Sequence, residues 1–163
     1  MSDENLKQGT RKTVKDSILD GASHGAGELN QAIDIQAKAA QHGFDWPNIE
    51  PVFDKIAEEL EELKQEVRKG KERHGFSFSS NNLEGPVNPE IQAEFGDLLF
   101  SCLNLSRFLG VRPEDALQTT NAKFMSRFRF IEERLQEKGE QMEQVSLSRL
   151  DQLWELAKKH ERT

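Results

Sequence analysis

Cysteine is nearly absent from this chain, which has a single one, Cys102, among 163 residues. An intrachain disulfide is therefore excluded, and we expect Cys102 to be a small residue of the core. No apolar run approaches the ~18 residues that a membrane span needs, and the polar stretch from Met1 to Lys12 lacks the apolar region of a signal peptide. These absences predict a cytoplasmic protein that does not bind membranes.

Hydrophobic residues are also scarce, at 35% of the chain, whereas 31% of the residues are charged and the net charge is −7. This composition is typical of amphipathic helices with solvated outer faces, and the length fits one domain. The acidic balance argues against non-specific binding to nucleic acids. Convincing strand alternation is absent, so we predict an all-α protein. The four histidines are too scattered to indicate a ligand set.

Apolar periodicity and helix-ending residues predict a helical bundle of about five helices. Residues 1–27 are rich in Ser, Thr, Gly, Lys and Asp, and we expect a flexible arm there, followed by a helical domain at 28–163. Phe44 and Trp46, in the turn after the first helix, are expected to anchor the core. The expected helices cover residues 28–41, 48–69 with Asn48 as cap and Gly70 as stop, 89–109, 113–138 and a short segment after Ser146, with a long loop at about 71–88.

Two acidic patterns stand out, Glu59-x-x-Glu62 and Glu94-x-x-Asp97, each on an expected helix. Side chains three residues apart leave the same side of a helix. At ~100° per residue, Glu59 falls at the edge of the apolar stripe of its helix, whereas Glu61 points to solvent. The first pattern alone would be read as a solvated helix face, and this reading is weaker for the second pattern because its neighbours are apolar. Both together, on adjacent helices, favour a site.

The expected third helix is apolar on most of its circumference, as a buried central helix would be. Its exception is a narrow polar stripe that can face the acidic side of the second helix. Buried carboxylates are costly unless a cation compensates them, and four of them facing one another would form an all-oxygen site suited to Mg²⁺ or Mn²⁺. The stripe consists of Glu94, Asp97, Ser101 and Asn104.

Basic and aromatic residues in the C-terminal third complete this chemistry. Lys123 and Arg127 are four residues apart on the fourth helix, with Asn121 near its apolar edge. A metal ion with nearby Lys and Arg suits a polyphosphate. Trp154 and Lys158 form another pair at helical spacing, suited to stacking on a base and contacting phosphate. The plainer alternative is that the basic residues are surface charges and Trp154 belongs to the core.

Several of these motifs resemble the MazG-like nucleoside triphosphate pyrophosphohydrolases, in particular the second of the two repeats of a full-length MazG protein. The resemblance covers roughly Ser17 to Lys159. Its most specific strings are Gly-Asp-Leu-Leu-Phe at 96–100 and Asn-x-Lys-Phe-x-x-Arg-Phe at 121–128. Further matching segments lie at 17–21, 38–40, 43–47 and 54–59.

The resemblance implies an all-α, Mg²⁺-dependent enzyme that hydrolyses an NTP or dNTP to the monophosphate and pyrophosphate. The metal would orient the phosphates and activate an attacking water. The family pattern of metal ligands maps onto Glu59, Glu62, Glu94 and Asp97, and Glu58 matches the first acid of the doublet. The implied substrate-binding residues are Lys55, Asn121, Lys123, Arg127, Trp154 and Lys158.

Two features depart from the family pattern. The spacer between Glu62 and Glu94 is longer than expected, and the first repeat is absent, which suggests a stand-alone single-repeat protein or an excised domain. We also expect a homodimer, because an open pair of amphipathic helices leaves apolar surface to cover. The main alternative is a non-catalytic helical module for oligomerisation or partner binding. A di-iron bundle is disfavoured because the Glu-x-x-His motif is missing.

Overall fold

The structure, a computed structural model, describes residues 17–22, 27–74 and 88–161. Within these ranges there are five α-helices and one short 3₁₀ helix but no strand, so the all-α prediction is confirmed. None of these helices is both long and apolar enough to cross a membrane. The elements are α1 (Glu28–Gln41), α2 (Glu50–His74), α3 (Pro89–Leu109), α4 (Pro113–Lys138), η1 (Met142–Gln144) and α5 (Leu147–His160).

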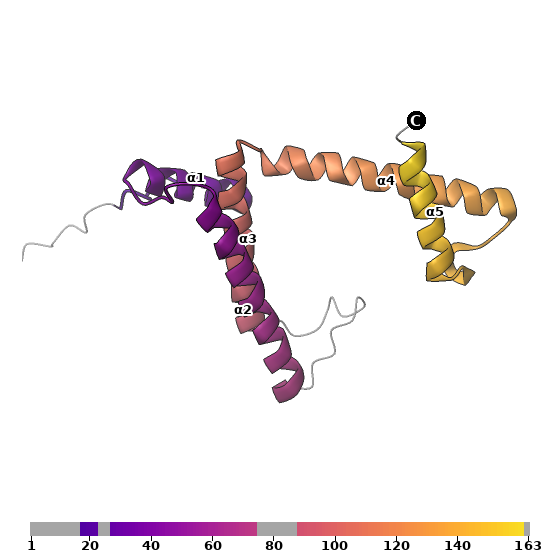
Figure 1. Cartoon of the computed structure of the whole chain (residues 1–163), viewed down its shortest axis with the longest axis horizontal. Helices are drawn as coiled ribbons and strands as arrows, with labels where there is room; N and C mark the ends of the chain where they lie inside the picture. The colour runs from indigo at the N-terminus through magenta and orange to yellow at the C-terminus, as the bar shows by residue number, and fades with distance from the viewer. Residues whose placement is uncertain (1–16, 23–26, 75–87, 162–163) are drawn as a thin grey trace, which may run out of the picture. The chain divides into compact units, whose positions relative to one another are not determined.

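The chain divides into two compact units, a first unit of residues 1–108 and a second unit of residues 109–163. The first unit contains α1, α2 and α3, and Figure 1 shows α2 and α3 side by side. Glu62 of α2 lies near Glu94 of α3, and Glu59, one turn earlier on α2, lines a pocket together with Asp97, so the two helices are antiparallel. This arrangement brings the two acidic patterns together.

Polar side chains accept backbone N–H groups at the starts of three helices, within two residues of the predicted positions. The Oδ1 atom of Asn48 accepts from the backbone N–H of Glu50 at 3.2 Å, and that of Asn88 accepts from Ile91 at 2.9 Å. Ser146 caps α5 in the same way through its hydroxyl oxygen. Such caps satisfy N–H groups that have no partner inside the helix. These helix starts could therefore be predicted from short-range chemistry alone.

The predicted end of the second helix at Gly70 is wrong, because α2 continues to His74. A glycine inside a helix is less favourable than alanine by only about 1 kcal/mol, and the residues around Gly70 are good helix formers. The predicted loop therefore begins later than residue 71, and residues 75–87 lie outside the described part of the chain. The predicted arm at 1–27 also lies mostly outside it, although residues 17–22 form a turn closed by the Asp20 side chain.

The second unit has a small core of its own, built where α4 and α5 pack together. Ile131 and Leu135 of α4 and Leu153 of α5 are buried there. Around them lie partly buried apolar side chains, including that of Trp154. Gly139 ends α4 at a φ of 63°, a left-handed conformation that glycine adopts without strain. The predicted extent of a single helical domain, 28–163, stays a prediction.

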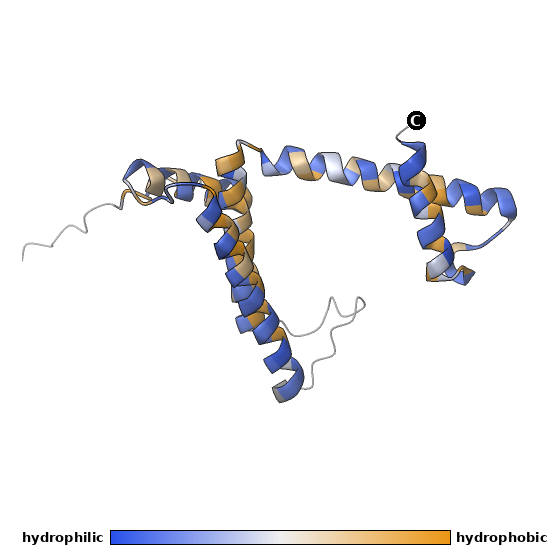
Figure 2. Ribbon diagram, in the orientation of Figure 1, coloured by the Kyte–Doolittle hydropathy of each residue, from blue (hydrophilic) through white to orange (hydrophobic). Residues whose placement is uncertain are grey.

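Two expectations about the burial of α3 are wrong within the single chain. Helix α3 is not buried at the centre, because Phe95, Leu99 and Phe100 are all exposed; Figure 2 shows how much of this helix is hydrophobic. Cys102, on the same helix, is exposed as well. The periodicity of α3 correctly indicates an apolar helix, but α1 and α2 cover only part of its surface.

Phe44 and Trp46 are likewise not core residues, with exposed fractions of 85% and 45%. They follow the end of α1, where Gly43 has a φ of 83° and turns the chain. Both rings line a pocket instead of filling an interior. Their position gives the first unit an aromatic wall beside its acidic residues.

Candidate active site

Three carboxylates converge where α2 and α3 lie side by side. Glu59, Glu62 and Glu94 each have a carboxylate oxygen within 4.8 Å of the other two. Glu59 is only 5% exposed, Glu94 is half-buried and Glu62 faces solvent. One turn of α2 separates Glu59 from Glu62, which puts both on the side that faces α3. The structure thus gathers three of the four predicted metal ligands.

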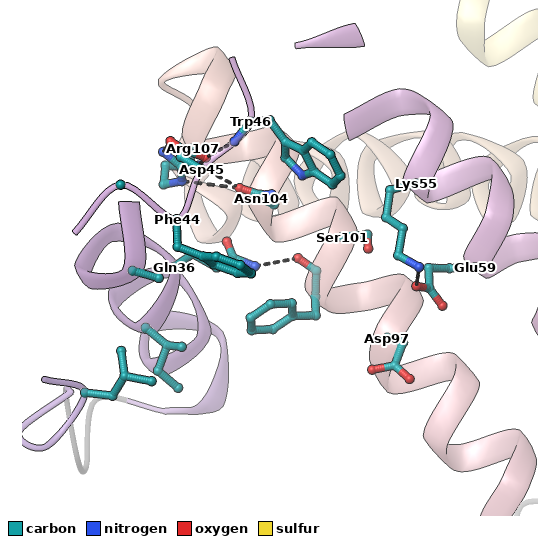
Figure 3. Close-up of a pocket in the computed structure, with 15 residues that line it drawn as sticks. Gln36, Phe44, Asp45, Trp46, Lys55, Glu59, Asp97, Ser101, Asn104 and Arg107 are labelled. Carbon is teal, nitrogen blue, oxygen red and sulfur yellow. Dashed lines mark hydrogen bonds and ion pairs between the residues drawn. The ribbon is translucent and has the colours of Figure 1, made fainter. Parts of the chain in front are cut away.

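The fourth predicted ligand, Asp97, lies one turn after Glu94 on α3. Its side chain is exposed and lines the same pocket as Glu59 (Figure 3), but it is not part of the three-carboxylate group. Carboxylates on neighbouring turns can reach a common cation, because their side chains leave the same side of the helix. Asp97 therefore extends the acidic surface along α3.

Lys55 supplies the positive charge that contacts this cluster from one turn earlier on α2. Its ammonium lies 2.6 Å from a carboxylate oxygen of Glu59 (Figure 3) and 3.0 Å from one of Glu58. These two carboxylates raise the pKa of Lys55 above its usual value. Lys55, a predicted phosphate-binding residue, is thus tied to the carboxylates, and Glu58 contacts the site through it.

The charges of the cluster are not balanced by Lys55 alone. Partial desolvation, together with the negative charges of Glu59 and Glu94, raises the pKa of Glu62. Three converging carboxylates face one ammonium group, so the arrangement retains an excess of negative charge. Oxygen-only donors of this kind fit a hard divalent cation such as Mg²⁺. The three carboxylates therefore fit Mg²⁺, the metal that the resemblance to MazG-like enzymes implies.

A cavity of about 610 Å³ extends from Glu59 and Asp97 along α3 to the turn after α1. Away from this acidic end, aromatic and aliphatic side chains line the cavity together with a few polar groups, among them Gln36, Asn104 and Arg107 (Figure 3). Cavities of this size, mostly apolar with a few placed polar groups, are typical of small-molecule sites. The lining residues are Leu19, Ile35, Gln36, Ala39, Gly43, Phe44, Asp45, Trp46, Lys55, Glu59, Asp97, Phe100, Ser101, Asn104 and Arg107.

An ion pair attaches the aromatic turn to α3. The guanidinium of Arg107 donates to both carboxylate oxygens of Asp45, at 2.9 and 2.5 Å, and also to Oδ1 of Asn104 at 2.9 Å. The hydrogen bonds from Arg107 lower the pKa of Asp45. A two-pronged contact of this kind fixes direction as well as distance. It holds the segment that carries Phe44 and Trp46 against α3.

Sequence reasoning missed several residues of this pocket, notably Gln36, Asp45 and Arg107. A signal for Gln36 was present, because it is a polar residue on the side of α1 that carries Leu29 and Ile33. No comparable signal marks Asp45 and Arg107, which are 62 residues apart and meet only in the folded chain.

The remaining predicted substrate-binding residues lie in the second unit, where some already have partners. The guanidinium of Arg127 is 2.9 Å from Glu161 and lies over the ring of Trp154, 5.4 Å from its centroid. Lys158 pairs with Glu155 at 2.8 Å. Asn121 and Lys123 are exposed on α4. The structure thus brings Arg127 and Trp154 together and leaves Lys123 accessible.

Comparison with known proteins gives the site a context. The family model of the MazG nucleotide pyrophosphohydrolase domain matches residues 48–130, which include Glu58 and the four predicted metal ligands. The chain is 42% identical over 130 residues to the nucleoside triphosphate pyrophosphohydrolase/pyrophosphatase MazG of Thermotoga maritima, covering 80% of this chain and 44% of that protein. It is 34% identical over 145 residues to the nucleoside triphosphate pyrophosphohydrolase of Escherichia coli K12, covering 89% of this chain and 50% of that protein.

A third relative is the uncharacterized protein YabN of Bacillus subtilis, 46% identical over 79 residues, which are 48% of this chain and 16% of that protein. The chain spans about half the length of the first two relatives and a smaller part of the third.

Proposed function

Because the chain belongs to the family of MazG nucleotide pyrophosphohydrolase domains, we propose that it hydrolyses a nucleoside or deoxynucleoside triphosphate to the monophosphate and pyrophosphate, with Mg²⁺ as cofactor. The observation that carries this proposal is the convergence of Glu59, Glu62 and Glu94 within 4.8 Å, with Glu59 buried. A buried carboxylate beside two others is unfavourable without a compensating cation. The family and the geometry therefore support the same chemistry.

Glu59, Glu62, Glu94 and Asp97 would hold the metal. When bound, a divalent cation supplies positive charge that phosphate oxygens and the attacking water can share. Lys55 orients the carboxylate of Glu59 through its 2.6 Å contact. Glu58, 3.0 Å from the same ammonium, is the neighbouring carboxylate that would accept a proton from water. The chain's own groups thus orient the ligands and remove the proton.

Lys123, Arg127 and Lys158 are the proposed partners of the phosphates, and Trp154 and Asn121 are further proposed contacts of the nucleotide. Phosphoryl transfer is catalysed largely by positioning and by charge stabilisation, which such groups supply. Support comes from the pairing of Arg127 with Trp154 on one surface of the second unit, where a cation and an aromatic ring are presented together.

The first experiment is to incubate the purified protein with a panel of NTPs and dNTPs and Mg²⁺, and to separate the products by chromatography. Monophosphate plus pyrophosphate, abolished by EDTA, is the expected result. Diphosphate plus phosphate would mean that a different bond is cleaved. No turnover of any nucleotide by folded protein would favour the alternative function, a non-catalytic helical module.

A homodimer is part of the proposal. The exposed apolar side chains of α2 and α3, among them Phe53, Phe95 and Leu99, give a reason for it, since water-exposed apolar surface of this kind is normally covered by a partner. Light scattering coupled to size-exclusion chromatography should give twice the 18.6 kDa mass of the chain. Leu99→Lys, which places a charge in this apolar surface, should shift the mass to that of one chain. Lys64→Ala, on the exposed face of α2, is the control.

A further inference from the structure

The amide group of Gln36 is the most unusual polar group in the pocket. Gln36 is only 7% exposed, and its Nε2 donates to the backbone carbonyl of Phe100 at 2.8 Å. Its Oε1 is also buried, but has no hydrogen-bond partner among the described residues. A buried acceptor without a donor is unfavourable. Because Nε2 is held by a carbonyl, the amide cannot turn over to hide this oxygen, so Oε1 stays an acceptor.

The surroundings of Gln36 suit a flat aromatic ring. Phe44, Trp46 and Phe100 line the same cavity, and all three are substantially exposed, so their surfaces are available to a ligand (Figure 3). Aromatic side chains stack on nucleobases, and one such contact is typically worth about 1–3 kcal/mol by alanine substitution. The cavity continues to Glu59 and Asp97. A nucleotide whose phosphates lie at the acidic residues can therefore place its base at Gln36.

We propose that Gln36 selects the base of the substrate, by accepting a hydrogen bond through Oε1 from the exocyclic amino group of a nucleobase seated beside Trp46. The proposal rests on the function proposed above and adds a substrate class to it. The proposed hydrogen bond favours nucleotides that carry an amino group on the base over those that carry a carbonyl at the same ring position.

The preference for an amino group follows from the two oxygens at this place. Oε1 of Gln36 and the carbonyl oxygen of Phe100 both belong to the contact between α1 and α3, and both are acceptors. An amino group has two hydrogens and is attracted to such a place, whereas a base carbonyl brings a third acceptor and is repelled. Asn104 lies one turn after Phe100 on α3. Its Oδ1 already accepts a hydrogen bond from Arg107, so its amide nitrogen is the part of the side chain that can still donate.

Paired substrates test this preference, because dCTP and dUTP, or dATP and dITP, differ by an amino group replaced with a carbonyl. We expect the unaltered protein to show a kcat/KM that is ~10–100-fold higher for the amino member of each pair. Gln36→Leu should reduce both ratios to about one. Gln41→Leu, the same change at an exposed position of α1, should leave them unaltered. Equal rates for both members in the unaltered protein, or ratios that survive Gln36→Leu, would overturn the proposal.

A substrate without a base separates loss of selection from loss of folding. Methyl triphosphate has the phosphates but no base, so Gln36→Leu and the unaltered protein should hydrolyse it equally. If Gln36→Leu also loses this activity, Gln36 has a structural role and base selection is overturned.

A binding measurement without Mg²⁺ separates this proposal from the hydrolytic function. Equilibrium dialysis against CMP or UMP measures this binding without altering any proposed contact of the nucleotide. CMP should bind more tightly than UMP, and Gln36→Leu should remove the difference. If this holds while no triphosphate is hydrolysed, the proposed function fails and base recognition stands. If triphosphates are hydrolysed but CMP and UMP bind equally well, base recognition by Gln36 fails.

Discussion

The two units of the chain use their interiors differently. Among the described residues, the buried set of the first unit contains three polar side chains, those of Gln36, Glu59 and Ser101. In the described part of the second unit, residues 109–161, the buried side chains are all apolar: Ile131, Leu135, Leu153 and Ala157. Burial of polar groups is unfavourable unless partners compensate it, whereas burial of apolar groups stabilises a fold directly. The first unit is therefore organised around a site, and the second around a small core.

The largest expected effect concerns the core of the second unit. Leu153→Ala removes a side chain that is packed against Ile131 and Leu135, and it should lower the free energy of unfolding by about 2–5 kcal/mol. Chemical denaturation followed by circular dichroism measures the loss. Leu156→Ala, at an exposed position of the same helix, should cost less than about 1 kcal/mol. Equal losses in the two variants would contradict the assignment of this core.

Next comes the acidic cluster, where substitution should affect activity more than folding. Glu59→Gln removes a buried charge that belongs to the proposed metal site, and kcat/KM for the preferred triphosphate should fall at least ~100-fold. Glu61→Gln is the matched control, since Glu61 is exposed and pairs with Lys64 and Arg68. Full Mg²⁺-dependent activity in Glu59→Gln would be incompatible with the proposed site.

A smaller effect is expected from the exposed lysine of α4. Lys123→Ala removes one proposed phosphate contact, so KM should rise ~10-fold while stability is unaltered. Steady-state kinetics with the preferred triphosphate measures the change. Lys138→Ala removes the same charge from the other end of α4 and should leave KM as it is. If both variants raise KM equally, the second unit contributes a general positive charge and no specific contact.

The smallest effect concerns the ion pair behind the aromatic turn. Arg107 lowers the pKa of Asp45 below its usual 3.8, so the stabilisation is fully present above that pH and is lost as pH falls through the depressed pKa. Asp45→Asn should therefore lower the free energy of unfolding by about 1 kcal/mol at neutral pH. The difference from the unaltered protein should shrink as the pH falls below about 3.8.

Denaturation at pH 7 and at pH 3 measures the two values. Asp54→Asn, at an exposed position of α2, is the control and should have little effect at either pH. A deficit of the Asp45→Asn variant that is equally large at both pH values would show that the stabilisation by Asp45 does not depend on its ionisation.

Local chemistry was sufficient to predict most of the helices. Asn48, Asn88 and Ser146 cap helices because a side-chain oxygen can reach an N–H group two or three residues later, whatever the rest of the chain does. Gly139 ends α4 for a similarly local reason. Gly70 does not end α2, because a single glycine is only a weak helix breaker and the flanking residues continue the helix.

Burial was predicted less well, because periodicity shows which face of a helix is apolar but not what covers it. Phe95, Leu99 and Cys102 were expected in a core and are exposed on α3. Phe44 and Trp46 were also expected in the core, but they line a pocket. In each case the sequence indicated a side chain that favours a non-aqueous contact, and the fold decided that neighbouring helices do not provide it.

The sequence by itself determined the helices and the two acidic pairs, because caps, apolar periodicity and the three-residue spacing act within one or two helical turns. Only the tertiary structure decided that Glu59 and Glu94 meet, that Arg107 reaches Asp45, and that Gln36 buries an acceptor against Phe100. These contacts join residues that are 35, 62 and 64 positions apart. Their formation depends on how whole helices pack, which no local pattern of side chains encodes.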